Sequence, residues 1–262
     1  MNDRNLRWAL PLAAGLGLVG VWYSLRHVAG LPAWLLPVPH EILAAMWRER
    51  AVLGAGAWQT TQSALLGFLA AAGGGLLLAV MMGSTRWLRL SLFPYLLMLQ
   101  TTPVIVIAPL IILWAGRGRL SIMIVTFIVS FFPVVVNTTH GMVSTDRNLV
   151  ELFEVWNARR WQRILLLQLP SAMPFYFAGL RIAAALAPIG AIFGEYVTGT
   201  VAGGTGGLGF LVQVYNNRQM RAELIGVGVT SCLLGFVFLG VIAVINWLLL
   251  RRWHDSIVRT DR

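Results

Sequence analysis

The chain has 262 residues, of which 58% are hydrophobic and only 11% are charged, and its mean hydropathy is +0.75. A soluble domain carries about 25% charged residues, so this composition cannot cover a globular surface and predicts an integral membrane protein. A helical span takes about 20 residues, so the chain has room for roughly six to eight spans but not for a separate soluble domain beside them.

The basic residues and the cysteine exclude several classes of protein. All 20 basic residues are arginine, and a nucleotide-binding P-loop needs a lysine, so the chain is not itself a P-loop ATPase. The single cysteine, Cys232, excludes an internal disulfide framework and a cysteine-based zinc site, and the four histidines lie too far apart for metal-ligand spacing. A net charge of +10 is typical of some nucleic-acid-binding proteins. Here the arginines flank apolar segments, so we expect neither a nucleic-acid partner nor a metal site.

Charge-poor stretches predict six membrane-spanning helices in one all-α domain over residues 1–262. The fifth stretch contains two charges, Arg181 and Glu195, but is otherwise mostly apolar. The first could instead be a signal peptide, but its apolar run is long, and Trp22, Tyr23 and Arg26 replace the small residues of a cleavage site. The expected spans in chain order are residues 8–26, 62–84, 90–115, 120–142, 172–201 and 224–250.

The distribution of arginines predicts that both chain ends lie in the cytoplasm. With the amino terminus inside, the inner side carries 12 arginines and the outer side 7. The loop 143–171 is then cytoplasmic, and residues 27–60, 116–119 and 202–222 are external.

Two features of the spans predict how the helices pack and bend. The second span has a stripe of small residues at every fourth position, which allows close helix packing either within the chain or between subunits. Prolines at membrane depth are expected to kink or break helices. The stripe consists of Gly67, Ala71, Gly75, Ala79 and Gly83, and the prolines are Pro103, Pro109, Pro133 and Pro188.

The cytoplasmic loop predicts a pair of short helices. Its first helix has one apolar face, because apolar residues fall at relative positions 0, 3, 4 and 7. Asn148 is a candidate for its amino-terminal cap, and Asn157 suits the left-handed turn that ends it. A second helix is expected from Ala158 to just before Pro170. The apolar positions are Leu149, Leu152, Phe153 and Trp156. Such a basic, amphipathic pair either lies on anionic lipid or docks a soluble partner.

This loop resembles the "EAA" loop of the permease subunits of bacterial ABC importers. That pattern is Glu-Ala-Ala, three residues, Gly, nine residues, and then Ile-x-Leu-Pro. Here Glu151 opens the pattern, Asn157 stands where Gly is usual, and residues 167–170 end in Leu169 and Pro170. The spacing fits in full, although the two alanines and the glycine are replaced. Asparagine is the next-best residue for a left-handed turn.

Further motifs resemble one branch of that family, the permeases for sulfonate, taurine, nitrate and thiamine-precursor uptake. The resemblance covers roughly residues 32–250. The motifs are Leu-Pro-Val-Pro-His-Glu-Ile at 36–42, Thr-Pro at 102–103, Ala-Pro-Leu at 108–110, Trp-Ala-Gly at 114–116, Phe-Phe-Pro-Val at 131–134, Asn-Thr at 137–138, Ala-Gly-Leu-Arg at 178–181 and Gly-Leu-Gly at 207–209.

The resemblance implies a type I ABC importer permease that is not an enzyme and holds no cofactor. Two permeases, either two copies or one copy and a paralogue, would surround the pathway in a bacterial inner membrane. Two ATPase subunits would bind ATP and dock on the loops, and an extracytoplasmic binding protein would deliver a small polar solute. That solute would be an anion such as a sulfonate, taurine or nitrate, or a heterocycle such as a thiamine precursor. The alternatives are a stand-alone secondary carrier, which predicts internal repeats, and a membrane enzyme, which needs clustered catalytic groups.

The resemblance places the contacts with the ATPase on the cytoplasmic loop. Trp156 and Phe153 are the expected apolar anchors, since large apolar side chains on a short cytoplasmic helix need lipid or a partner to cover them. Glu151 either faces the ATPase or stabilises a helix start. The candidate docking residues are Glu151, Phe153, Glu154, Trp156, Asn157, Ala158 and Pro170.

Arg181 and Glu195 are the candidate pathway residues. A charge at the bilayer centre costs about 2.5–3.5 kcal/mol, so it usually faces a cavity or a partner. The two lie 14 residues apart, about 21 Å along a straight helix, and are not expected to pair. Arg181 either attracts an anionic substrate or extends to the cytoplasmic interface. Glu195 would bind a cationic ring or gate the pathway.

The segment Gly204 to Gly209 matches a dinucleotide-binding fingerprint by chance, since no βαβ unit surrounds it. We expect instead a flexible external loop near the binding protein. Its candidate contact residues are Gly206, Gly207 and Gly209.

Overall fold

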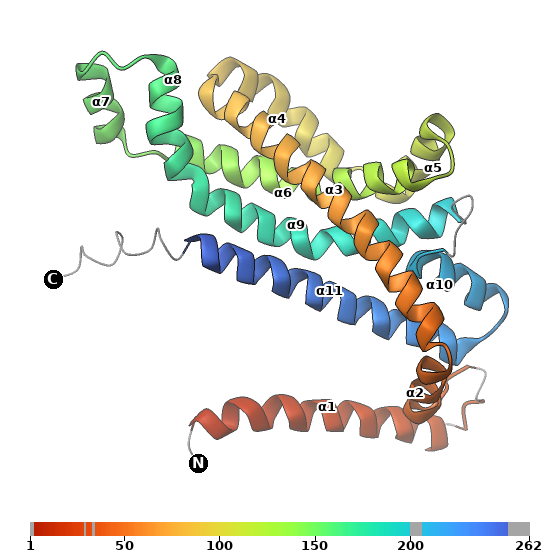
Figure 1. Ribbon diagram of the computed structural model, residues 1–262. Coiled ribbons are helices and arrows are strands. Elements are labelled where there is room, and N and C mark those ends of the chain that lie inside the picture. The colour runs from red at the N-terminus through yellow and green to blue at the C-terminus, as the bar shows by residue number, and fades with distance from the viewer. Residues whose placement is uncertain (1–2, 29, 33–34, 200–205, 251–262) are drawn as a thin grey trace.

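The computed structural model describes residues 3–28, 30–32, 35–199 and 206–250, and all regular structure in these ranges is helical (Figure 1). The all-α fold is therefore confirmed. The elements are α1 (Asp3–Val28), α2 (Pro39–Arg48), α3 (Arg50–Ser84), α4 (Arg86–Thr101), α5 (Val104–Ala115), α6 (Arg119–Val143), α7 (Arg147–Val155), α8 (Arg160–Arg163), the π-helix η1 (Ile164–Gln168), α9 (Leu169–Thr198), α10 (Leu208–Asn217) and α11 (Arg221–Leu250).

Five helices of the described chain are long and apolar enough to cross a membrane. They are α1, α3, α6, the continuous run from α8 to α9, and α11, and the bent pair of α4 and α5 raises the number to six. Several helices extend past the charge-free stretches. For example, α3 begins at Arg50, twelve residues before the expected span at 62–84, because a charge at a helix end does not interrupt its backbone hydrogen bonds.

The expected span 90–115 is not one continuous helix. It forms α4 and α5, which meet at an angle of 100°. The break falls at Thr102 and Pro103: proline disfavours the helical conformation of the preceding residue, and Thr102 is extended. The other three prolines expected to disturb spans, Pro109, Pro133 and Pro188, lie inside helices that continue through them.

The core forms where α6 packs against α3 and α9. The small residues of α3 permit this close approach. A Cβ atom at Gly75 would lie 2.8 Å from Val134 Cγ1, and one at Gly83 would lie 2.7 Å from Met142 Cβ. Both neighbours belong to α6, so the stripe serves packing within the chain and the subunit-interface alternative is wrong for it.

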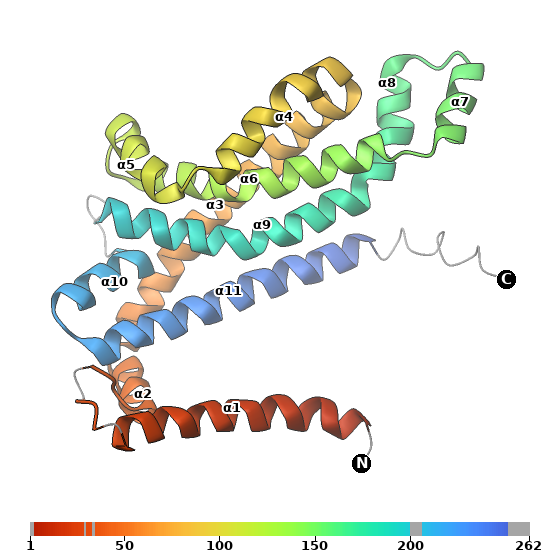
Figure 2. The ribbon, with the colours of Figure 1, turned by 180° about the vertical axis from the view of Figure 1, so that it is seen from behind.

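The helices run between two ends of the molecule (Figures 1 and 2). At one end, which we call the α7 end, lie α7, α8, the start of α1 and the end of α11. At the other, the α10 end, lie α2, α5 and α10. Helix α1 stands apart from the bundle in both views, and none of its apolar window is buried. Its last turns are held at the α10 end, where Trp22 Nε1 donates to the Pro37 carbonyl at 3.1 Å.

Candidate functional site: an exposed amphipathic helix and a buried polar cluster

Helix α7 begins at Arg147, two residues earlier than a cap at Asn148 would place it. Asp146 is the cap, and its carboxylate accepts a hydrogen bond of 2.9 Å from the Asn148 backbone N–H. The expectation that Asn148 caps the helix is therefore wrong. The structure favours an anionic cap because the first amides of a helix carry partial positive charge.

Asn157 ends α7 in the left-handed conformation, with φ 52°, as the sequence predicts. This turn lets the next amides bond back to the helix: the N–H of Ala158 reaches the Phe153 carbonyl at 2.9 Å. Asparagine tolerates this conformation better than most side chains other than glycine. Asparagine in place of the usual glycine thus preserves the left-handed turn at position 157.

Helix α7 presents its side chains to the surroundings, and none of them is buried. Trp156 is 78% exposed, and Val155, which the periodicity did not single out, is 75% exposed. Phe153 is only half-buried, and Trp161 on α8 adds a second exposed indole. An apolar surface of this kind needs a cover of lipid or protein.

The two glutamates of α7 are bound to arginines of the same loop. Glu151 accepts from Arg147 Nε at 2.9 Å, and Glu154 accepts from Arg163 at 2.6 Å. Glu151 is the fifth residue of the helix, outside its first turn, so the helix-start alternative for it is wrong. Exposed pairs of this kind contribute little stability, about 0–1 kcal/mol, and can exchange partners readily.

Arg160 connects the loop 143–171 to the membrane helices. Its guanidinium donates to the Ser84 carbonyl at 2.6 Å and to Thr85 Oγ1 at 3.0 Å, at the junction of α3 and α4. The contact satisfies a carbonyl that has no partner within the helix. Sequence reasoning missed Arg160, since no local pattern relates residues 75 positions apart.

The second helix of the loop does not stop before Pro170, as was expected. It runs from α8 through the π-helix η1 into α9 as one segment, Arg160–Thr198. Pro170 lies in the first turn of α9. A proline has no N–H and crowds the carbonyl four residues earlier, and the wider π turn before it accommodates both effects without a break.

A buried polar cluster joins α3, α9 and α10 at the α10 end. Glu195 is 2% exposed, and its Oε2 accepts from Thr60 Oγ1 at 2.8 Å and from the Gly209 N–H at 3.1 Å. The N–H of Leu208 in turn donates to Thr60 Oγ1 at 2.9 Å. A buried carboxylate is tolerated only when hydrogen bonds replace water, and the first amides of α10 supply them.

The three glycines expected to form a flexible external loop are instead buried at the start of α10. Gly206, Gly207 and Gly209 are all buried, and a side chain at Gly207 would overlap the carboxylate of Glu195. One at Gly209 would overlap the carbonyl of Ile192 on α9. The flexible-loop expectation is wrong for these residues, because the glycines allow close contact between α10 and α9. Gly204 lies outside the described residues.

Arg181 makes no ion pair within the described part of the chain. It lines a hollow between α9 and α11 together with Asn246 and Trp247. Arg181 and Glu195 thus have separate surroundings, as their spacing predicts.

A second cluster of polar residues at the α10 end joins α2 to α10 and α11. Tyr215 OH donates to Glu49 Oε2 at 3.1 Å, and Arg48 Nη2 lies 3.4 Å from Glu223 Oε1. Burial and, to a smaller extent, the negative charge of Glu49 together raise the pKa of Tyr215 to about 12. The phenol of Tyr215 therefore stays protonated and can donate its hydrogen bond to the Glu49 carboxylate.

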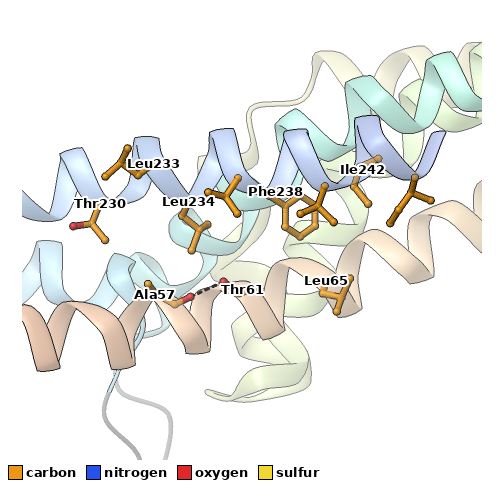
Figure 3. Close-up of a pocket in the computed structure, with 11 residues that line it drawn as sticks. Ala57, Thr61, Leu65, Thr230, Leu233, Leu234, Phe238 and Ile242 are labelled. Atoms are coloured by element: carbon orange, nitrogen blue, oxygen red, sulfur yellow. Dashed lines mark hydrogen bonds between the residues drawn. The ribbon is translucent and has the colours of Figure 1, made fainter. Parts of the chain in front are cut away.

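An apolar groove of about 450 Å³ runs between α3 and α11 (Figure 3). Its walls include Leu65, Leu234 and Phe238, and its two threonines bond to their own helices: Thr61 Oγ1 donates to the Ala57 carbonyl at 2.7 Å, and Thr230 Oγ1 donates to the Gly226 carbonyl at 2.8 Å. Both hydroxyl groups therefore have no hydrogen left to donate to a ligand. The groove suits lipid chains or another helix rather than a polar solute.

Long apolar helices, one pair of them sharply bent, with an exposed amphipathic helix at one end, define a multi-pass membrane protein. The chain belongs to the family of binding-protein-dependent transport system inner membrane components, whose family model matches residues 71–258. It is 35% identical over 252 residues to the riboflavin transport system permease protein RibX of Chloroflexus aurantiacus, covering 94% of this chain and 90% of that one.

Other relatives carry different substrate names. The formylaminopyrimidine transport permease protein ThiX of Halalkalibacterium halodurans is 37% identical over 168 residues, which cover 64% of this chain and 63% of ThiX. The taurine transport system permease protein TauC of Escherichia coli is 24% identical over 273 positions, 98% of this chain and 97% of TauC.

Membership of this family confirms the resemblance seen in the sequence. The chain is a multi-pass inner-membrane permease of an importer, not an enzyme, and ATP is bound by a separate ATPase. Its partners are an ATPase and a binding protein. The secondary-carrier and membrane-enzyme alternatives are therefore wrong.

Proposed function

We propose that this permease pairs with a second permease, either another copy or a paralogue, and that each docks one of two ATPase subunits through α7. The observation that carries the proposal is the exposed apolar surface of α7, with Trp156 and Val155 at its carboxyl-terminal end. Glu151 and Glu154 border this surface and would exchange their arginine partners for groups on the ATPase. Phe153, Asn157 and Ala158 would shape the turn that enters the ATPase groove.

Pro170 contributes in a different way. It lies beyond η1, in the first turn of α9. We propose that it shapes the joint between the docking loop and the span, rather than contacting the ATPase.

We propose that the α7 end lies in the cytoplasm, together with both termini. The excess of arginines on the α7 side of the spans supports this orientation. The start of α1 and the end of α11 also lie at the α7 end (Figure 1). The span boundaries expected from the charge-poor stretches remain a proposal as well.

We infer that α10 is the external gate of the pathway and that the hydrogen bonds of Glu195 hold it closed. The carboxylate holds the first amides of α10 against α3 and α9, and the three glycines permit the contact. A binding protein at the α10 end would meet α2 and the turn between α10 and α11, since the glycines themselves are buried. Binding of this protein would break or re-form the hydrogen bonds of Glu195 with Thr60 and Gly209.

We propose a small heterocycle, such as a flavin or a pyrimidine, as the substrate class. The support is the similarity to the riboflavin and formylaminopyrimidine permeases, at 35% and 37% identity. The permeases named for sulfonates and taurine are 24–30% identical. The carboxylate of Glu195 also accepts hydrogen bonds from Thr60 and Gly209, which reduces its capacity to select a cation.

Docking is tested by purifying the tagged permease in a mild detergent from its native host and identifying the retained proteins by mass spectrometry. Trp156→Asp should lose the ATPase, because it places a charge on the apolar surface. Trp58→Asp is the matched control: Trp58 is 64% exposed on α3 and lies far from α7 in the chain. If wild type retains no ATPase, or if both variants retain it equally, α7 is not the docking element.

The substrate class is tested on the binding protein recovered in the same purification. Calorimetric titration with riboflavin and a formylaminopyrimidine should give saturable binding, whereas taurine, an alkanesulfonate and nitrate should give none. Binding of one of these anions instead would assign the chain to ion uptake.

A further inference from the structure

A hollow of about 490 Å³ between α9 and α11 combines one charge with apolar walls. It is lined by Phe177, Arg181 and Ile182 of α9 and by Ala243, Asn246 and Trp247 of α11. Asn246 is fixed in place, because its amide nitrogen donates to the Phe177 carbonyl at 3.2 Å. The hollow is thus a formed site with a cation at its wall.

The Arg181 guanidinium is exposed and has no anionic partner in the described ranges. The other charge of α9, Glu195, lies 14 residues along the helix and is bonded to Thr60 and Gly209. A guanidinium within a membrane-spanning helix is costly unless an anion or water satisfies it. The hollow therefore favours an anionic ligand.

The position of the hollow points to the lipid headgroup region. Asn246 and Trp247 belong to the last two turns of α11, at the α7 end, and Arg251 and Arg252 follow directly in the sequence. Tryptophan is enriched where a bilayer meets water, and arginines mark the same boundary. The phosphates of a phospholipid leaflet lie at this level, which Phe177 shares through its bond to Asn246. Arg181 lies one turn farther along α9, and Ile182 and Ala243 extend toward the hydrocarbon.

We propose that this hollow binds one anionic phospholipid, with its phosphate held by the Arg181 guanidinium and its chains lying against Ile182 and Ala243. Arginine forms strong charge-assisted hydrogen bonds to phosphate, often two in parallel. The proposal rests on the family's location in the membrane and not on the docking, gating or substrate proposals. It gives Arg181 a lipid-binding role rather than a role in the pathway.

The test is native mass spectrometry of the purified permease complex after exchange into nanodiscs of phosphatidylglycerol and phosphatidylcholine in equal parts. Wild type should retain phosphatidylglycerol in preference to phosphatidylcholine, one molecule per permease chain. Arg181→Gln should weaken this retention roughly tenfold, since a charged hydrogen bond is lost. Arg181→Lys should keep part of it. Ala243→Phe, which fills the hollow and leaves the charge, should weaken the retention at least as much as Arg181→Gln. Arg89→Gln, on α4, is the matched control and should behave as wild type.

Three results would overturn the proposal. The first is equal retention of the two lipids by wild type. The second is unchanged retention in both Arg181→Gln and Ala243→Phe. The third is displacement of phosphatidylglycerol by millimolar inorganic phosphate or ethanesulfonate, which would make a soluble anion the ligand. ATPase co-purification, measured on the same samples, reports separately on the docking proposal.

Discussion

Replacing Thr60 with valine should destabilise the permease and loosen α10. The hydroxyl of Thr60 donates to Glu195 and accepts from the Leu208 N–H, and valine has nearly the same shape without either bond. The change leaves one buried amide unsatisfied and removes one of the two bonds to a buried carboxylate. The unsatisfied amide costs about 1–3 kcal/mol and the lost bond about 1 kcal/mol more, so we expect a loss of about 2–4 kcal/mol.

Thermal unfolding in detergent measures this loss. In a chain of this size 1 kcal/mol corresponds to roughly 2–4 °C, so the midpoint of Thr60→Val should fall by roughly 4–16 °C. Thr60→Ser is the matched control, because it keeps the hydroxyl and removes only a methyl group. Its midpoint should stay close to wild type. Equal midpoints for the valine and serine variants would refute the role assigned to the hydroxyl.

Three further predictions concern other contacts of the described chain. Arg160→Ala should leave the ATPase bound but reduce ATPase stimulation by the liganded binding protein several-fold, because the loop loses its two bonds to the α3–α4 junction; full stimulation in reconstituted vesicles would contradict this. Gly75→Leu should cost at least about 1–3 kcal/mol through overlap with Val134 and lower the monodisperse fraction in size-exclusion chromatography. Gly73→Leu on the same helix has open space and should not, so equal losses would count against the packing argument. Tyr215 is neutral in the folded protein up to its pKa of about 12, so its contribution to stability is present below pH 10 and is lost as the pH rises from 10 to 12. Thermal midpoints across this range should fall more for wild type than for Tyr215→Phe, and parallel curves would exclude the effect.

The spans and the amphipathic helix α7 were predictable because their signals are local. Long charge-poor stretches identify membrane helices, and apolar residues at relative positions 0, 3, 4 and 7 identify α7. The left-handed Asn157 was likewise predictable from its position after that pattern. The cap was misplaced by two residues, because Asp146 and Asn148 both favour a helix start and the periodicity does not choose between them.

The contacts between distant helices were not predictable. Glu195 and Thr60 are 135 positions apart, and no pattern in a single sequence links them. The glycines of α10 were interpreted as a loop because glycine marks both flexible turns and close contacts. Only the position of α9, which packs against Gly207 and Gly209, shows that here they make close contacts. The break at Pro103 shows the same limit, since three other prolines in spans leave their helices intact.

Photo-crosslinking in living cells tests the central claim, that α7 docks the ATPase, most directly. A benzoylphenylalanine placed at Trp156 would be irradiated in the native host, and the adducts identified by mass spectrometry, with the same probe at Trp58 as the control. Docking predicts an adduct between position 156 and the ATPase subunit, and none from position 58. An adduct of position 156 with phospholipid alone would show that α7 lies on the membrane surface, and the docking account would be wrong.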